Sequence, residues 1–251
     1  MQAREILAKG VLTRSRIPGV DYCVNPYVGC AHACSYCYAA FMKRFTGHPE
    51  PWGEFLDAKR NAVALLRRQL RRARPGRVLL SSVTDPYQPA ERVHRLTRGC
   101  LESLLSFRFP VTILTRSPLV LRDLDLFSRF RDVSVGFSIP TGDDAVRRLF
   151  EPRSPPIPAR IEALGALHAA GIPTYVFVGP LLPQDPARLV EAIGGAADEV
   201  LVDRLNYPDR VRPLYLRHGL SSYLEDGWFA ATAAALGRGF GARGVKVQVV
   251  F

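Results

Sequence analysis

The sequence lacks several features that would place the chain in a well-known class. Its 251 residues contain no apolar run of about 18 residues, and the N-terminal stretch MQAREILAKG lacks the apolar core and small-residue cleavage site of a secretory signal. We therefore expect a cytoplasmic protein with no membrane partner. No Gly-x-Gly-x-x-Gly motif follows the first predicted strand and no Gly-x4-Gly-Lys-Ser/Thr occurs, which disfavours dinucleotide and phosphate-loop sites. Without a repeat or a shift in composition, residues 1–251 are predicted to form one domain.

Cysteine is scarce and unevenly placed. Three of the five cysteines, Cys30, Cys34 and Cys37, fall within eight positions of the segment NPYVGCAHACSYCYA, with the spacing C-x3-C-x2-C. An odd, clustered set argues against a disulfide framework, and gathered thiolates favour zinc or an iron–sulfur cluster. A structural zinc would take a fourth ligand, which Cys23 would supply, whereas a [4Fe–4S] cluster on three cysteines would leave one iron open.

Lysine is also scarce, so the net charge of +11 comes mainly from arginine. The densest basic run is RRQLRRARPGR at 67–77, where Val63, Leu66 and Leu70 mark the predicted buried helical stripe and the arginines fall on other faces. This charge favours a polyanionic partner such as nucleic acid. The alternative is an arginine-rich composition caused by codon bias, with the charge spread over a solvated surface.

Short apolar runs alternate with amphipathic stretches along the chain, which predicts an α/β fold with a parallel sheet and right-handed crossovers. Periodicity does not separate a doubly wound sheet from an open or closed barrel. After about residue 206 the sequence predicts one more helix, at 222–236, and a final strand, GVKVQVVF. The six central strands are predicted at 22–28, 78–83, 111–115, 133–139, 174–179 and 199–205, and the helices between them at 55–73, 94–107, 120–130, 156–170 and 186–197.

The cysteine segment, with Tyr36 as the aromatic residue before Cys37, resembles the cluster motif of radical S-adenosylmethionine (SAM) enzymes. Together with VTDPYQPAE at 83–91 and the segment 151–183, it is similar to the spore photoproduct lyase-like branch of that superfamily. The resemblance runs from about Asp21 to Asn206. It implies an open, partial (β/α)6 TIM-like barrel as the core, with a short C-terminal extension at 207–251.

The resemblance also implies an enzyme with a [4Fe–4S] cluster on Cys30, Cys34 and Cys37. Such an enzyme receives an electron from a donor such as flavodoxin or ferredoxin, and cleaves SAM to a 5′-deoxyadenosyl radical that abstracts hydrogen from its substrate. The substrate is not identified by the sequence; nucleic acid, as in DNA repair, is one class that the charge favours. The alternative from another class is a zinc-binding, nucleic-acid-binding module without catalysis.

Further site residues follow from the same resemblance, and all of them lie at or near the carboxyl ends of predicted strands or in the cysteine loop. Tyr38 and Asp85 are the candidate catalytic residues, since one adjoins the cluster and the other lies in the predicted substrate cavity with Tyr87 and Glu91. The candidate SAM-binding residues are Tyr36, Ser82, Thr84, Arg116, Ser138 and Val178.

The remaining polar and sulfur side chains receive structural interpretations. Cys23 and Cys100 lie on apolar stripes and are predicted to be small buried hydrophobic residues. His32 is predicted to bond the loop backbone, and Glu151 to fix its loop through an ion pair with Arg153. One departure from the family pattern matters: Val83 stands about where the lyase would need a hydrogen-donating cysteine.

Overall fold

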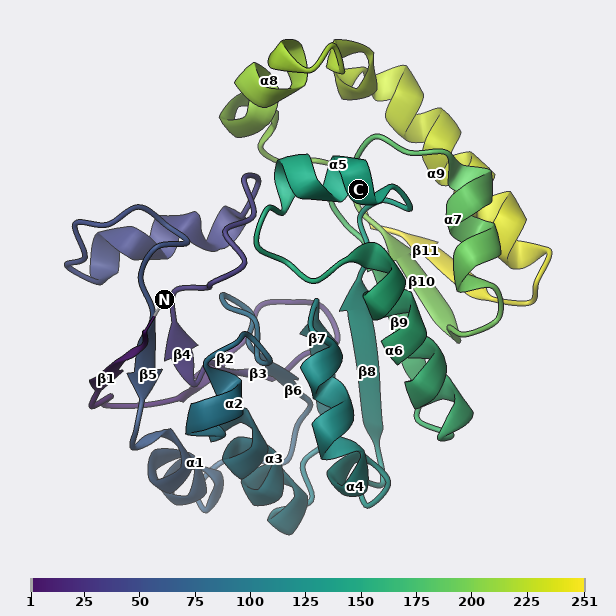
Figure 1. The fold of residues 1–251 in the computed structure, drawn as a ribbon. Coiled ribbons are helices and arrows are strands. Elements are labelled where there is room, and N and C mark those ends of the chain that lie inside the picture. The colour runs from purple at the N-terminus through teal and green to yellow at the C-terminus, as the bar shows by residue number, and fades with distance from the viewer. Residues whose placement is uncertain (1, 251) are drawn as a thin grey trace. The chain divides into compact units, whose positions relative to one another are not determined.

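The computed structural model describes residues 2–250 as a mixed α/β protein (Figure 1). Two compact units are distinguished by their internal contacts. The first comprises the residues up to Ala33 together with Ala39–Val135, and the second comprises Cys34–Tyr38 together with the residues from Gly136 onward. The chain thus enters the second unit at Cys34, returns to the first at Ala39, and enters the second again within strand β8 (Val133–Ser138).

The first unit contains four strands of the main sheet, in the order β2-β3-β6-β7. Strand β3 pairs in parallel with β6, and β6 pairs in parallel with β7, while β2 pairs with β3 in the antiparallel direction. The bounds are Leu12–Arg14 for β2, Tyr22–Val24 for β3, Val78–Leu80 for β6 and Val111–Thr115 for β7. Because the parallel strands all point the same way, their carboxyl ends lie on one edge of this sheet.

Helices of the first unit follow these strands. Gly99 of α3 lies so close to Val63 of α1 that an added Cβ would be 2.6 Å from its side chain, which explains a glycine inside a helix. The elements are α1 (Ala62–Leu70), α2 (Glu91–His94), α3 (Leu96–Ser106), the 3-10 segments η1 (Tyr38–Phe45, from Ala39 onward in this unit) and η2 (Pro118–Asp123), and α4 (Leu124–Phe127).

A small separate sheet, in the order β1-β5-β4, also belongs to the first unit. It is built from β1 (Arg4–Ile6), β4 (Tyr27–Val28) and β5 (Asp57–Lys59). The predicted first strand at 22–28 is therefore two strands in two sheets, separated at Asn25 and Pro26. Proline has no N–H to give to a ladder, which is consistent with the break at this point.

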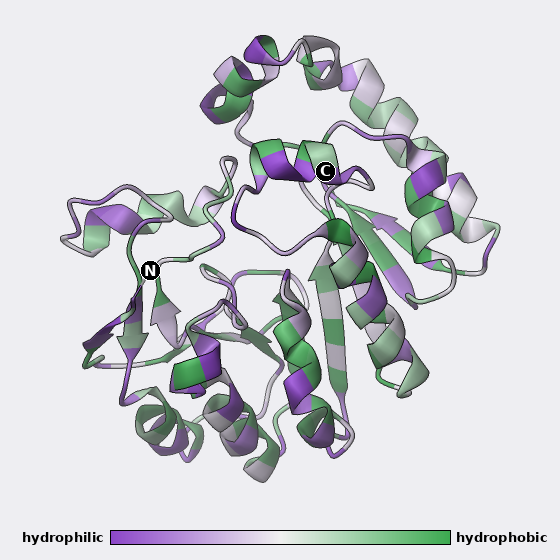
Figure 2. Ribbon diagram, viewed as in Figure 1, coloured by the Kyte–Doolittle hydropathy of each residue, from purple (hydrophilic) through white to green (hydrophobic). Residues whose placement is uncertain are grey.

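The second unit holds β9 (Thr174–Val178), β10 (Glu199–Val202) and β11 (Lys246–Val249), with β10 paired in parallel with both neighbours. Figure 2 shows hydrophobic and hydrophilic residues alternating along its helices, as expected for helices with one buried face. These helices are α5 (Asp144–Phe150), α6 (Ile157–Ala169), α7 (Pro186–Ile193), α8 (Pro208–Arg217) and α9 (Asp226–Gly241), with a 3-10 turn η3 (Ser221–Leu224).

The predicted strand–helix alternation is confirmed, with trimmed ends. The predicted helix at 55–73 is wrong in its first part, where β5 lies, and α1 spans only Ala62–Leu70. Within residues 2–250, no helix has both the length and the apolar character needed to cross a membrane.

Candidate functional site: the cysteine loop and its two anchors

The cysteine loop begins with a backbone that only glycine fits. Gly29 has φ +87°, and a Cβ at this position would lie 2.4 Å from the carbonyl oxygen of Phe55. A second glycine, Gly53, has φ +97° and lies against Ala33, where an added Cβ would be 2.6 Å from the alanine methyl. These two close approaches fix the path of the chain on either side of Cys30.

Within the first unit, a glutamine and a threonine from the segment after β6 hold the start of the loop. The amide of Ala31 donates a 3.0 Å hydrogen bond to Oε1 of Gln88, and Nε2 of Gln88 donates a 3.0 Å bond to Oγ1 of Thr84. The Thr84 hydroxyl in turn donates to the carbonyl oxygen of Gly29. Thr84, a predicted SAM-binding residue, therefore uses its hydroxyl to bind the cysteine loop.

Ser82, the neighbouring predicted SAM-binding residue, is bonded to the strand before the loop. Its Oγ accepts a 3.3 Å hydrogen bond from Nδ2 of Asn25, and Oδ1 of Asn25 accepts a 3.1 Å bond from the amide of Val83. One asparagine thus ties the ends of β3 and β6 together. Ser81, immediately before, has a buried hydroxyl without a hydrogen-bond partner among residues 2–250.

His32 lies in the middle of the loop and is only 1% exposed. Its Nε2 is 3.2 Å from Oδ2 of Asp85, whereas no backbone group of the described chain bonds to the ring. The prediction that His32 bonds the loop backbone is therefore wrong. The reason is a tertiary contact: the segment after β6 brings the buried Asp85 carboxylate to the His32 ring, and the ring stabilises the buried negative charge.

Asp85, predicted as a catalytic residue, is 3% exposed and accepts several hydrogen bonds. Oδ1 accepts from Thr115 Oγ1 at 2.7 Å and from the Tyr87 amide at 2.8 Å, and Oδ2 accepts from the Arg116 amide at 2.8 Å. Burial alone would raise the pKa of this carboxyl. The His32 imidazole and the hydrogen bonds from Thr115 and Arg116 outweigh burial and hold the pKa at about 2.

Tyr87 and Glu91 were predicted to line a substrate cavity with Asp85, but both are fully buried. The Tyr87 hydroxyl donates a 3.0 Å hydrogen bond to Oδ2 of Asp123, and Glu91 accepts from the Tyr27 hydroxyl and from Arg122 at 2.8 Å. Burial and the Asp123 carboxylate raise the pKa of Tyr87 well above its usual value. These side chains hold the helix after β6 in place rather than facing a substrate.

The second anchor of the loop lies in the second unit, where residues 34–38 contact the end of α5. The amide and the hydroxyl of Ser35 both donate to the carbonyl oxygen of Phe150, at 2.9 and 3.2 Å. The sulfur of Cys34 lies 3.9 Å from Oγ of Ser154. The motif EPRSP at 151–155 therefore contacts the loop directly.

A buried chain of polar groups reinforces this second anchor. The Tyr36 hydroxyl donates to one oxygen of Glu151, and Nη2 of Arg160 donates to the other. Both Glu151 and Arg160 are fully buried. Arg160 also donates to the carbonyl oxygens of Ser138 at 2.8 Å and Pro155 at 3.0 Å, so the guanidinium has three separate acceptors. Glu151 was predicted to pair with Arg153; its buried ion pair is with Arg160.

Other predicted site residues occupy the expected strand ends. Ser138 is the last residue of β8 and Val178 the last of β9, and both are buried. Arg116 follows β7 directly. Tyr38 is 48% exposed and begins η1. The structure adds one contact that no motif indicated: Nη1 of Arg210, in α8, donates a 3.1 Å hydrogen bond to the carbonyl oxygen of Cys37.

The donor chemistry of the loop suits an iron–sulfur cluster. Cys30, Cys34 and Cys37 are half-buried and form no disulfide, and their short spacing keeps them within one loop. Cys23, in β3, and Cys100, in α3, are buried, as predicted, and burial raises the pKa of the Cys100 thiol. Within residues 2–250, no three Cys, His, Asp or Glu side chains are gathered as in a formed metal centre. The loop therefore offers three thiolates, which fit a cluster with one open iron better than a four-ligand zinc.

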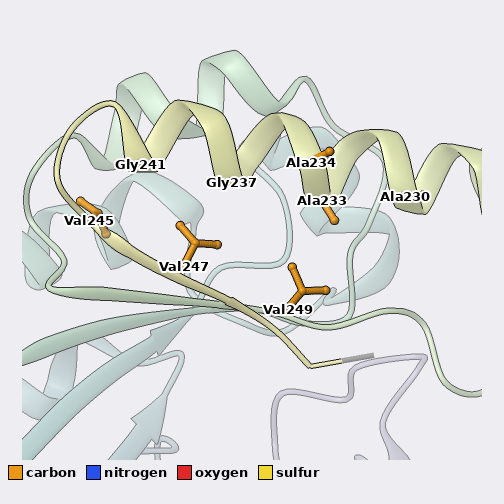
Figure 3. Close-up of a pocket in the computed structure, with 8 residues that line it drawn as sticks. All are labelled: Ala230, Ala233, Ala234, Gly237, Gly241, Val245, Val247 and Val249. Carbon is orange, nitrogen blue, oxygen red and sulfur yellow. The ribbon is translucent and has the colours of Figure 1, made fainter.

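A surface groove of about 570 Å³ lies elsewhere in the second unit, between α9 and β11 (Figure 3). It contains none of the predicted site residues, and its walls are entirely alanine, glycine and valine: Ala230, Ala233, Ala234, Gly237, Gly241, Val245, Val247 and Val249. A groove without a polar side chain has no group to orient a substrate.

Sequence comparison identifies relatives in archaea, bacteria and a phage. An uncharacterized protein of Methanocaldococcus jannaschii is 38% identical over 179 residues, which cover 71% of this chain and 67% of the relative. An uncharacterized protein of Mycobacterium tuberculosis is 36% identical over 202 residues, covering 72% of this chain and 56% of the relative. The radical SAM Nalpha-GlyT isomerase of Pseudomonas phage M6 is 26% identical over 161 residues, covering 63% of this chain and 33% of that protein.

Solved structures show the same fold. Spore photoproduct lyase complexed with dinucleoside spore photoproduct has a TM-score of 0.68 at 14% identity, covering 98% of this chain and 82% of the lyase chain. SuiB of Streptococcus suis bound to its precursor peptide SuiA has a TM-score of 0.53 at 15% identity, covering 80% and 46% of the two chains. The family model described as Radical SAM superfamily matches residues 24–193, more than half of the chain and including the whole cysteine loop. The chain belongs to the radical SAM superfamily of enzymes.

Proposed function

We propose that Cys30, Cys34 and Cys37 hold a [4Fe–4S] cluster whose open iron binds SAM. When bound, this cofactor pair supplies the reductive cleavage of SAM to a 5′-deoxyadenosyl radical, which abstracts hydrogen from the substrate. The observation that carries the proposal is the set of three half-buried cysteines, none of them in a disulfide, in one short loop inside the family match. The zinc-module alternative loses its fourth ligand, because Cys23 is buried within β3.

The chain's own contribution is to position this loop. Gln88 and the His32–Asp85 contact hold its first part, while Glu151, through Tyr36, holds its second part. We assign Asp85 a positioning role, because its oxygens already accept bonds from Thr115, Tyr87 and Arg116. Tyr38, exposed beside Cys37, remains our candidate for hydrogen or electron transfer during the reaction.

The SAM contacts remain proposals from the family resemblance. Arg116 would pair with the SAM carboxylate, Ser138 would reach the ribose hydroxyls and Val178 would pack on the adenine. Tyr36 would offer its backbone to the adenine, and the segment Ser82–Asp85 would lie near the methionine end of SAM. Arg116 directly follows β7, Ser138 ends β8 and Val178 ends β9, and the carboxyl ends of strands are where β/α folds place their sites.

The partners that we propose are an electron donor such as flavodoxin or ferredoxin and a nucleic-acid substrate. Enzymes of this superfamily take their electron from a reductant. The net charge of +11 supports a polyanionic substrate, as does the dinucleoside bound by the structurally similar lyase. We further propose that residues 1–251 form one domain, because the chain passes between its two compact units inside the cysteine loop and again in β8.

The test is a cysteine series on anaerobically purified protein. Replacing Cys30, Cys34 or Cys37 by Ala should each abolish the visible absorbance of the cluster and the formation of 5′-deoxyadenosine with dithionite and SAM. Cys23→Ala and Cys100→Ala should keep both, because these thiols are buried in β3 and α3. A colourless parent protein that contains zinc, and loses it in Cys23→Ala, would overturn the proposal.

A further inference from the structure

The segment that follows the cysteine loop carries aromatic rings on the protein surface. This segment, η1, has the sequence YAAFMKRF and contains no acidic residue. Phe41 is 38% exposed and Phe45 is 67% exposed. Most of Phe45 lies in solvent and contributes little to the core, while Phe41 keeps more than a third of its surface in solvent.

A cation orders these two rings. The guanidinium carbon of Arg44 lies 5.5 Å from the centre of the Phe41 ring and 4.7 Å from the centre of the Phe45 ring. Both distances are in the range of a cation–π interaction. One arginine therefore contacts two exposed rings and limits their freedom before any partner arrives.

The backbone beneath the rings is also held. Nζ of Lys43 donates a 3.0 Å hydrogen bond to the carbonyl oxygen of Pro49, and Oγ1 of Thr46 donates a 2.8 Å bond to the carbonyl oxygen of Lys43. These bonds close the turn that follows η1. The aromatic surface is thus a preformed feature, which lowers the entropy cost of binding.

Exposed rings beside cations fit the nucleotides of an unpaired strand. Bases that are not stacked on each other stack on aromatic side chains, and arginine adds attraction for the phosphates and the base faces. A radical enzyme that acts on a base also needs that base outside a duplex stack. An acidic protein partner would be attracted by the positive charge but would gain less binding energy from the rings. The combination of rings and charge therefore favours an unpaired nucleic-acid strand.

We infer that Phe41, Arg44 and Phe45 form a stacking platform for the bases of single-stranded nucleic acid. This inference rests on the proposed function, because it names the substrate class and the place of its contact. Only three residues separate Phe41 from Cys37, so the chain places the platform next to the cluster loop. DNA and RNA share the stacking chemistry, and the experiment separates them.

The test measures binding of fluorescein-labelled oligodeoxythymidine and oligouridine to the anaerobic, cluster-loaded protein by fluorescence anisotropy. The oligonucleotides are about 12 nucleotides long, within the range of site sizes of single-strand-binding domains. Phe41→Ala and Phe45→Ala should each weaken binding by roughly tenfold, the usual effect of removing one stacking ring. Phe45→Trp should keep the affinity of the parent. Val93→Ala, which removes a 79% exposed hydrophobic residue on α2, is the matched control and should bind as the parent does.

Charge is tested separately by salt titration. Arg44→Ala should lower the slope of log affinity against log salt by about one, as for the loss of one phosphate contact. Arg68→Ala, an exposed arginine on α1, is the control and should change the slope less. The oligonucleotide that binds more tightly, DNA or RNA, identifies the sugar of the substrate.

Two outcomes would overturn the inference. The first is equal affinity of the parent and the Phe41→Ala/Phe45→Ala double variant for both oligonucleotides. The second is a double variant that binds the strands normally but accepts electrons more slowly from flavodoxin, which would make the surface a docking site for the reductant. SAM cleavage by the parent with dithionite is measured in parallel, so a failure of the proposed function is seen independently of strand binding.

Discussion

Asp85 illustrates how one side chain can be fully used for positioning. Its carboxylate accepts hydrogen bonds from Thr115, from the amides of Tyr87 and Arg116, and faces His32 in the cysteine loop. A carboxylate oxygen has room for about two such bonds, so the group has little capacity left for a substrate. The buried Asp85 carboxylate instead links the cysteine loop, through His32, to Thr115 and Arg116 at the end of β7.

The low pKa of Asp85 predicts a specific loss of stability in acid. The folded-state pKa is about 2 and the ordinary value is 3.8, so the unfolded chain binds a proton more readily than the folded one. The Asp85 carboxylate therefore contributes about 2 kcal/mol to the free energy of unfolding. This contribution is complete above a pH of about 4 and is lost as the pH falls towards about 2.

Urea unfolding between pH 5 and pH 2.5 checks this prediction, with Asp85→Asn as the comparison. The variant should be less stable at pH 5 because the charge is gone, but its free energy of unfolding should fall less steeply with acid. Parallel curves for the two proteins would show that Asp85 does not titrate in this way.

At the scale of elements, the cysteine loop is held by short segments that follow strands or helices. The fully buried Arg160, on α6, reaches three acceptors: the Glu151 carboxylate and the carbonyl oxygens of Ser138 and Pro155. A lysine offers its donors from a single point and does not reproduce this fork. The arginine thereby ties the end of β8 and the start of α6 to the glutamate that holds Tyr36.

We predict that Glu151→Gln destabilises the protein by about 3–5 kcal/mol, because it leaves the buried Arg160 charge without its partner. Tyr36→Phe should cost about 1 kcal/mol, since it removes one hydrogen bond. Arg148→Ala is the control: its ion pair with Asp144 is exposed and should contribute less than about 1 kcal/mol. Urea unfolding measures all three, and a Glu151→Gln protein within 1 kcal/mol of the parent would contradict the role given to the buried pair.

The elements that the sequence predicted are those with long patterns. The strands β7, β8 and β9 are rich in apolar and β-branched residues, and α6 has a clear buried stripe, so these strands and this helix were predicted. The strands β1, β2 and β5, of three residues each, were missed, because three residues outside a longer apolar run carry too little pattern. Helix α8 escaped prediction as well, because Pro213 lies inside it and its sequence is largely polar.

The same contrast holds in the candidate site. Cys30, Cys34 and Cys37 were identified because metal ligation imposes a spacing that is visible along the chain. The roles of Gln88 and Arg160 depend on which distant groups the fold brings to them, and no local pattern records this. The motifs around Gln88 and Glu151 indicated the right segments, but the partners of these side chains required the structure.

At the scale of the whole molecule, the positive charge is spread over several surfaces. Arg67 and Arg68 on α1 are exposed, as are Arg71 and Arg72 just after it, and Nε of Arg67 donates a 3.2 Å hydrogen bond to Oγ of Ser103. Exposure of this helix face is consistent with both phosphate contact and a solvated surface. The η1 segment differs because it combines charge with exposed rings, and this combination is specific to a partner with flat apolar faces.

The fold of the chain matches that of spore photoproduct lyase, but its chemistry should differ at one point. The family resemblance implies a hydrogen-donating cysteine near the end of the second main strand, and Val83 stands about there, after β6. A valine C–H bond is too strong to donate a hydrogen atom as a thiol does. Cys100, the nearest other thiol in sequence after this strand, is fully buried in α3 and has a raised pKa, so it does not replace the missing donor.

We therefore predict that the reconstituted, dithionite-reduced protein cleaves SAM but does not repair spore photoproduct efficiently. The measurement is incubation with SAM and a spore-photoproduct dinucleotide, followed by chromatography of 5′-deoxyadenosine and of the thymidine dinucleotide TpT. We expect 5′-deoxyadenosine with little or no TpT, because no residue at the end of β6 can return a hydrogen atom to the product radical. Conversion to TpT at rates like those of the lyase would show that another group donates the hydrogen and that the lyase reaction is the natural one.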